Sequence, residues 1–123
     1  MKISVTAENN NGLESTVAQH FGHAPFFIMV EIENGEVTTT QGLANPFAMA
    51  HQPGQIPAYI HEQKANVILS GGMGGRAIDF FEQLGIRAVT GARGTVHQAL
   101  ENYLGGKLKE AAPCSESVAH GHG

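Results

Sequence analysis

The sequence predicts an α/β fold in which helices flank a five-stranded mixed sheet. One observation is a construction that occurs twice between residues 66 and 108, namely a short apolar strand, a glycine loop and an amphipathic helix. Another is the Asn34-Gly35 pair between two strand-like runs, which is typical of a type I′ hairpin. The repeat predicts parallel strands joined by a helix, and the hairpin predicts antiparallel strands, so the sheet is expected to be mixed.

The first part of the chain reads as three strands. Residues 2–7 alternate apolar and polar side chains, which predicts a half-buried strand. Residues 13–19 are compatible with one or two turns of helix. Residues 26–32 are rich in aromatic and β-branched side chains, and residues 37–40 supply their hairpin partner, so both runs are predicted as strands.

Three helices are predicted in the rest of the chain. A loop with two prolines at residues 45–54 precedes the first helix, which shows Ile56 and Ile60 on one face and ends near residue 65. The two repeated units then supply strands at 66–70 and 86–89, each followed by a helix, at 76–84 and 95–104.

Local signals mark the ends of the two later helices. Thr95 and Gln98 have the spacing of a capping box, which predicts the start of the last helix. Gly85 and Gly105 stand where C-terminal helix caps belong.

Composition limits the class of protein. The 123 residues predict one domain over residues 1–110, followed by a flexible tail over residues 111–123, where the periodic pattern stops. The formal net charge of −4 argues against a nucleic-acid partner, and no apolar run approaches the roughly 20 residues of a membrane helix. A single cysteine rules out an internal disulfide and predicts a cytoplasmic protein.

The two glycine loops are the first candidate site. Backbone N–H groups at the positive end of a helix favour an anion, and Arg76 and Arg93 would add positive charge. The thioether of Met73 suits a soft, sulfur-rich or metal-bearing partner. Alternatively, the glycines only permit tight turns between strand and helix. The first loop consists of Gly71, Gly72, Met73, Gly74 and Gly75.

A dinucleotide site is an alternative use of the first loop. Residues 72–77 formally match a Gly-x-Gly-x-x-Ala fingerprint after a strand. However, the second strand of the unit ends Val89-Thr90-Gly91, so the acidic residue that would hold a ribose is missing. A Walker motif is also missing.

Histidine and cysteine side chains are candidate metal ligands. His20 and His23 surround a Phe-Gly turn and can face one pocket, and neutral imidazole suits iron, zinc, copper or molybdenum. The alternative is one surface histidine and one hydrogen-bonded structural histidine. The tail adds Cys114, His120 and His122, although a complete site usually needs four pre-organised ligands.

Catalysis is not expected. The sequence shows no Ser-His-Asp arrangement, no paired carboxylates and no Cys-His dyad in a credible context. Asp79 is the only aspartate, and it lies within a predicted helix. We therefore expect a binding protein whose pocket lies between the residue 20–23 turn and the residue 71–75 loop, on the carboxyl side of the parallel strands.

Together these motifs resemble the dinitrogenase iron–molybdenum cofactor biosynthesis family. The resemblance runs from Lys2 to Leu108. It implies a ribonuclease-H-like, three-layer α/β fold and a non-catalytic carrier or chaperone that binds the iron–molybdenum cofactor, its precursor or a related metal–sulfur cluster non-covalently. The motifs that carry it are His20-Phe21-Gly22, Pro25-Phe26-Phe27, Gly71-Gly72-Met73-Gly74, Gly85-Ile86, Gly91-Ala92-x-Gly94-Thr95-Val96 and Tyr103-Leu104-x-Gly106-x-Leu108.

The resemblance also assigns roles. It implies that His20 contacts the cluster and that the loop around Met73 forms the pocket wall, with cluster-donor or cluster-acceptor proteins as partners. His23 is less secure, and the Cys/His tail lies outside the match. The fold name suggests a nuclease, but the required acidic cluster is missing. Two other functions stay open: a module that holds a phosphate-bearing metabolite, and a regulatory domain that recognises a protein.

Overall fold

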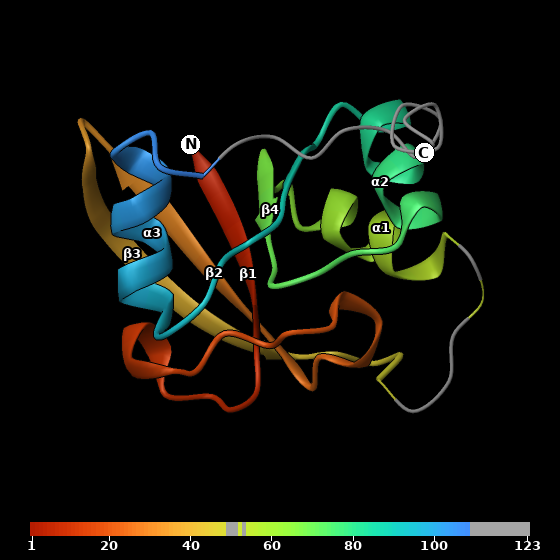
Figure 1. Ribbon diagram of the computed structural model, residues 1–123, viewed down its shortest axis with the longest axis horizontal. Coiled ribbons are helices and arrows are strands. Elements are labelled where there is room, and N and C mark those ends of the chain that lie inside the picture. Colours follow the sequence, from red (N-terminus) through yellow and green to blue (C-terminus); the bar gives the residue numbers. More distant parts are fainter. Residues whose placement is uncertain (49–51, 53, 109–123) are drawn as a thin grey trace.

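A five-stranded mixed sheet forms the centre of the computed structural model, which describes residues 1–48, 52 and 54–108 (Figure 1). The strand order is β3-β2-β1-β4-β5. β1 pairs antiparallel with β2, as does β2 with β3, whereas β1–β4 and β4–β5 are parallel. The strands are β1 (Lys2–Ala7), β2 (Phe26–Glu33), β3 (Glu36–Ala44), β4 (Val67–Leu69) and β5 (Arg87–Val89).

Helices cover both faces of the sheet. On one face lies α3 (Val96–Leu104), and on the other lie α1 (Gln55–Glu62) and α2 (Gly75–Gln83) (Figure 1). Each face has its own hydrophobic cluster, since the buried residues of α3 belong to one cluster and those of α1 and α2 to the other. The predicted three-layer α/β architecture and its mixed sheet are confirmed.

The predicted hairpin is also confirmed. Asn34 and Gly35 have φ values of 55° and 79°, the pair of positive values that a type I′ turn requires. The second strand of the hairpin runs to Ala44, four residues beyond the predicted end. The parallel pairing of β4 with β5 agrees with the prediction from the two strand–loop–helix units.

Two predictions in the first part of the chain are wrong. β1 is not half-buried: Ser4 and Thr6 are as fully buried as its apolar residues, because β1 is the central strand and is covered on both faces. Residues 13–19 do not form an α-helix. Only the short 3-10 turn η1 (Gly12–Glu14) is helical, and the chain then extends along the edge of the sheet because its backbone pairs with residues of three other segments.

The capping signals are confirmed in detail. The Thr95 hydroxyl accepts from the Gln98 amide, and the Gln98 side chain accepts from the Thr95 amide, so the box is complete. Gly85 follows α2 with φ +77°. After α3 the cap is Gly105 with φ −83°, and the left-handed residue is Gly106 with φ +80°.

We expect Thr95→Ala to lower the free energy of unfolding by about 1 kcal/mol, because it removes the hydroxyl that caps α3. Thr95→Ser keeps the hydroxyl and should stay close to the wild type. Urea unfolding followed by circular dichroism measures both. Equal stability of the alanine and serine variants would show that the Thr95 hydroxyl contributes nothing to the stability of α3.

Candidate functional site

The first glycine loop is joined to the segment that precedes the His20 turn. The Gly71 amide donates to the Ala18 carbonyl at 3.1 Å, and the Phe21 amide donates to the Gly72 carbonyl at 3.0 Å. His20 and Gly72 consequently form a parallel bridge. Because these are backbone contacts, the turn and the loop hold a fixed relative position at the carboxyl edge of β4.

The second glycine loop joins the same network. The Gly91 amide donates to the Gly71 carbonyl at 3.0 Å, and the Val17 amide donates to the Gly94 carbonyl at 2.9 Å. Both loops therefore lie at one edge of the sheet, as the parallel strands predict. The chain between residues 15 and 21 runs across this edge and contacts both loops.

Two buried hydroxyl groups, of Thr6 and Ser70, lie beneath the segment of residues 15–21 that crosses this edge. The Thr6 hydroxyl donates to the Ser70 hydroxyl at 3.1 Å, and the Ser70 hydroxyl donates to the Gly72 carbonyl at 3.1 Å. Both residues are fully buried. These bonds connect the end of β1 to the first loop and satisfy the two hydroxyls, which would otherwise be costly to bury.

Gly71 and Gly74 of the first loop differ in the space available for a side chain. A Cβ on Gly71 would lie 2.7 Å from the Cα of Gln19, so the crossing segment leaves no room for a side chain. A Cβ on Gly74 would meet nothing within 4 Å, and the φ of Gly74 is an ordinary −68°. Gly71 is thus explained by the fold. Gly74 leaves open space beside the backbone.

The helices after the two loops differ at their N-termini. The N-cap of α2 is Gly74, which has no side chain to cap the helix, whereas the Thr95–Gln98 box caps α3. In the second loop, moreover, the Ala92 amide already donates to the Ser70 carbonyl at 3.1 Å. Only the first loop therefore leads into a helix whose first-turn amides lack a side-chain partner, which is the arrangement that suits an anion.

A cavity of about 310 Å³ opens beside the first loop. Its walls come from the 3-10 turn η2 (Phe21–His23), from the start of α2 and from the start of α1. The sequence predicts the walls formed by η2 and by the start of α2, but not the wall formed by the start of α1. The only sequence feature that could have indicated this third wall is the glycine at position 54, directly before α1. Gly54 has φ +88° and, like Gly74, is the N-cap of a helix without a side-chain cap.

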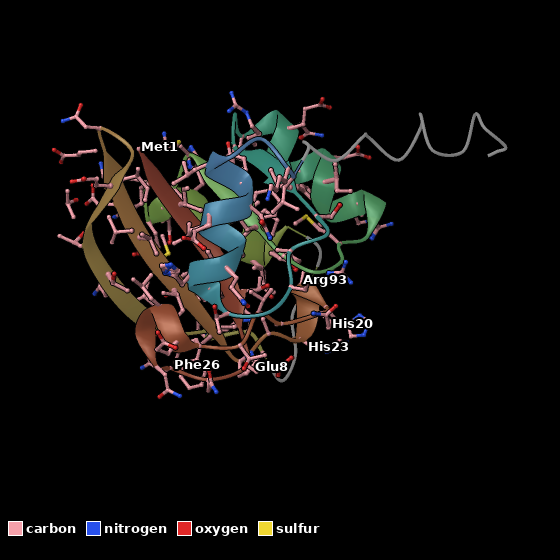
Figure 2. All side chains as sticks on the ribbon, turned by 60° about the vertical axis from the view of Figure 1, so that its left-hand side comes forward. Met1, Glu8, His20, His23, Phe26 and Arg93 are labelled. Atoms are coloured by element: carbon pink, nitrogen blue, oxygen red, sulfur yellow. The ribbon has the colours of Figure 1, made fainter. Side chains whose placement is uncertain are left out.

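His20, His23 and Arg93 lie on the same side of the molecule, at the rim of this edge (Figure 2). All three are exposed. None of their side chains forms a hydrogen bond or ion pair within the described part of the chain. The histidines do not line the cavity; the residues between them, Phe21 and Gly22, do.

The other predicted site residues divide into three groups. Arg76 is exposed and lines the cavity. Met73 is half-buried and packs against the hydrophobic cluster of α1 and α2, so its side chain has a structural role. The predicted tail ligands Cys114, His120 and His122 lie outside the described residues.

Metal coordination by protein side chains alone is not supported in the described ranges. Within residues 1–48, 52 and 54–108, no group of three or more His, Cys, Asp and Glu side chains is placed to hold a metal ion. Instead, the edge offers two imidazoles, two guanidinium groups without a carboxylate partner among the same residues, and the start of α2. Such a set can hold an anion that brings its own metal and ligands.

Comparison with known proteins places the chain among relatives of similar size. The family model described as dinitrogenase iron-molybdenum cofactor matches residues 1–106. Protein MJ0580 of Methanocaldococcus jannaschii is 30% identical over 112 residues, which cover 89% of this chain and 91% of the relative.

Two solved structures share the fold. The crystal structure of PH0822 has 35% identity and a TM-score of 0.79, and the match covers 90% of this chain and 96% of that one. The apo form of the orange protein from Desulfovibrio gigas has 28% identity and a TM-score of 0.81, with 91% and 93% covered. In the described part of this chain, no helix is long and apolar enough to span a membrane.

The two glycines provide a matched test of the site geometry. We expect Gly71→Ala to lower the free energy of unfolding by about 1–3 kcal/mol, because the new methyl group overlaps the Gln19 backbone. Gly74→Ala should lower the free energy of unfolding by less than about 1 kcal/mol, because it loses only the preference for glycine over alanine at an N-cap. Urea unfolding of both variants measures the difference, and a Gly74 variant less stable than the Gly71 variant would contradict this assignment.

Proposed function

The chain belongs to the dinitrogenase iron-molybdenum cofactor family, and from that membership we propose that it binds a preformed metal–sulfur cluster and does not act as an enzyme. The cluster is the iron–molybdenum cofactor, its precursor or a related metal–sulfide cluster. The observation that carries the proposal is the meeting of His20, His23 and Arg93 with the uncapped start of α2 at one edge of the sheet.

Charge is the first support. Metal–sulfide clusters with organic acid ligands are anionic, and the chain as a whole is also negative, with a formal charge of −4. Binding must therefore depend on local positive groups. Arg93 at the rim, Arg76 at the cavity and the start of α2 supply them within one edge of the sheet.

The ligand set is the second support. Two exposed imidazoles can contact metal atoms at the surface of a cluster, whereas guanidinium and amide groups donate hydrogen bonds to its sulfide or carboxylate atoms. With so few side-chain ligands in the described residues, the protein is suited to hold a finished cluster rather than to assemble one. The cluster is thus cargo, bound non-covalently.

Exposure is the third support. Because His20, His23 and Arg93 are open to solvent, a bound cluster would stay within reach of a donor or acceptor protein. A relative at 28% identity is called the orange protein and is known in an apo form. Colour together with an apo form agrees with a metal-containing ligand, and we carry this property to the present chain as part of the proposal.

We expect His20→Ala to weaken binding of the cluster about ten- to a hundredfold, on the scale of perturbed metal sites. The measurement is anaerobic titration of isolated iron–molybdenum cofactor into the protein, followed by visible absorption. His61→Ala is the matched control, since His61 is also exposed but lies at the far end of α1 from the cavity.

Thermal unfolding of both variants is measured beside the titration. His20 makes no side-chain hydrogen bond within the described residues, so its removal should leave the melting temperature close to that of the wild type. If a folded His20→Ala variant binds the cluster with wild-type affinity, His20 does not contact the cluster, and the proposal loses its central residue. Equal losses in the His20 and His61 variants would show non-specific binding to surface histidines.

A further inference from the structure

We propose that the cavity between η2, α1 and α2 binds a small organic carboxylate with an apolar body. This site is next to the rim that carries His20 and His23, which do not line it, and it shares Arg76 and the start of α2 with the proposed cluster site. The inference goes beyond the proposed cluster binding and does not depend on it, since the cavity's own side chains recognise the acid.

Phe80 is the first observation. This large apolar side chain is only half-buried and lines the cavity. On α2, Ala77, Phe81 and Leu84 pack against the hydrophobic cluster, whereas Phe80 belongs to neither cluster of the described residues. Phe80 therefore presents aromatic surface to the cavity and does not contribute to the core.

The opposite walls are apolar as well. Phe21 and Ile56 are 6% and 1% exposed, and Pro57 is buried beside them. Gly54 brings the start of α1 close to the Phe80 ring, because a Cβ at Gly54 would lie 3.2 Å from two of the ring atoms. Such walls favour a ligand with an apolar body.

Arg76 supplies the charge. It lies four residues before Phe80, so the two side chains share a face of α2, and both line the cavity. Arg76 forms no ion pair within the described residues. A guanidinium group binds a carboxylate through two parallel hydrogen bonds, and the open backbone at Gly74 lets the acid group approach from the side.

Size restricts the ligand further. A volume of about 310 Å³ is at the lower end of the range for ligand pockets, which suits an acid with one ring or a short branched chain. Such an acid reaches the cavity either free or as a ligand already attached to a metal cluster. The same side chains recognise it in both cases.

The probe is phenylacetate. It is titrated into the cluster-free protein, and binding is followed by NMR through the chemical shifts of the backbone amides. We expect saturable binding near the millimolar range for so small a ligand, with shifts at Gly74, Ala77 and Phe80. Inorganic phosphate has the charge without the apolar body, and phenylacetamide has the body without the charge. Both should bind at least about tenfold more weakly.

Variants locate the site. Arg76→Gln should weaken phenylacetate binding about tenfold and Phe80→Ala several-fold. Arg93→Gln and His20→Ala are the controls and should bind phenylacetate like the wild type, since neither residue lines the cavity, although His20→Ala is expected to weaken cluster binding. The two proposals can thus fail separately.

The outcomes are decisive for the cavity. Phosphate that binds as tightly as phenylacetate would overturn the proposal and indicate a general anion site, as would an Arg76→Gln variant with unchanged affinity. An absence of shifts at these residues up to tens of millimolar would also overturn it. A repeat with cluster-loaded protein separates the two sources: undisturbed binding indicates a free acid, and competition indicates that the cluster and the acid occupy the same groups at Arg76 and the start of α2.

Discussion

The crossing of residues 15–21 over the carboxyl edge of the sheet is the constraint on which the site depends. Ala18 donates to the Thr6 carbonyl at 2.9 Å and accepts from Gly71, so one residue connects the ends of β1 and β4. The carboxyl ends of the central strands are therefore closed by backbone, and a ligand cannot reach them directly. The chain leaves this crossing at His20, which fixes the histidine turn at the rim beside the cavity.

This crossing places the two glycine loops in different structural environments, although their sequences look alike. The second loop is bonded on both sides, through Val17 and Ser70, and it leads into a helix with a complete capping box. The amides of Gly91 and Ala92 and the carbonyl of Gly94 have partners within the fold. The first loop is held at Gly71 and Gly72, after which the backbone at Gly74 is open and begins an uncapped helix. Sequence repetition thus predicts the position of both loops but not which of them is available to a ligand.

The sequence predicts those structural features that depend on residues close together in the chain. The turn at Asn34 and Gly35, the Thr95–Gln98 box and the parallel repeat are local signals, and the structure contains each of them. Burial of Ser4 could not be predicted from alternation, because it depends on β1 becoming the central strand. The contribution of α1 to the cavity does not follow from the sequence for a similar reason, since residues 54–57 meet α2 only through tertiary packing.

The exposure of the histidine and arginine side chains at this edge is consistent with a cargo that is bound and then passed on. Exposed histidine and arginine side chains make contacts that water and salt weaken, so each contributes little affinity alone. Several such contacts acting together can hold a cluster, yet each can be exchanged singly for a contact to an acceptor protein. A buried cage of ligands would bind more tightly but would release its cargo slowly, because affinity differences appear mainly in the dissociation rate. An open rim on a rigid, backbone-bonded edge is therefore suited to a carrier, in which the cargo must be both held and passed on.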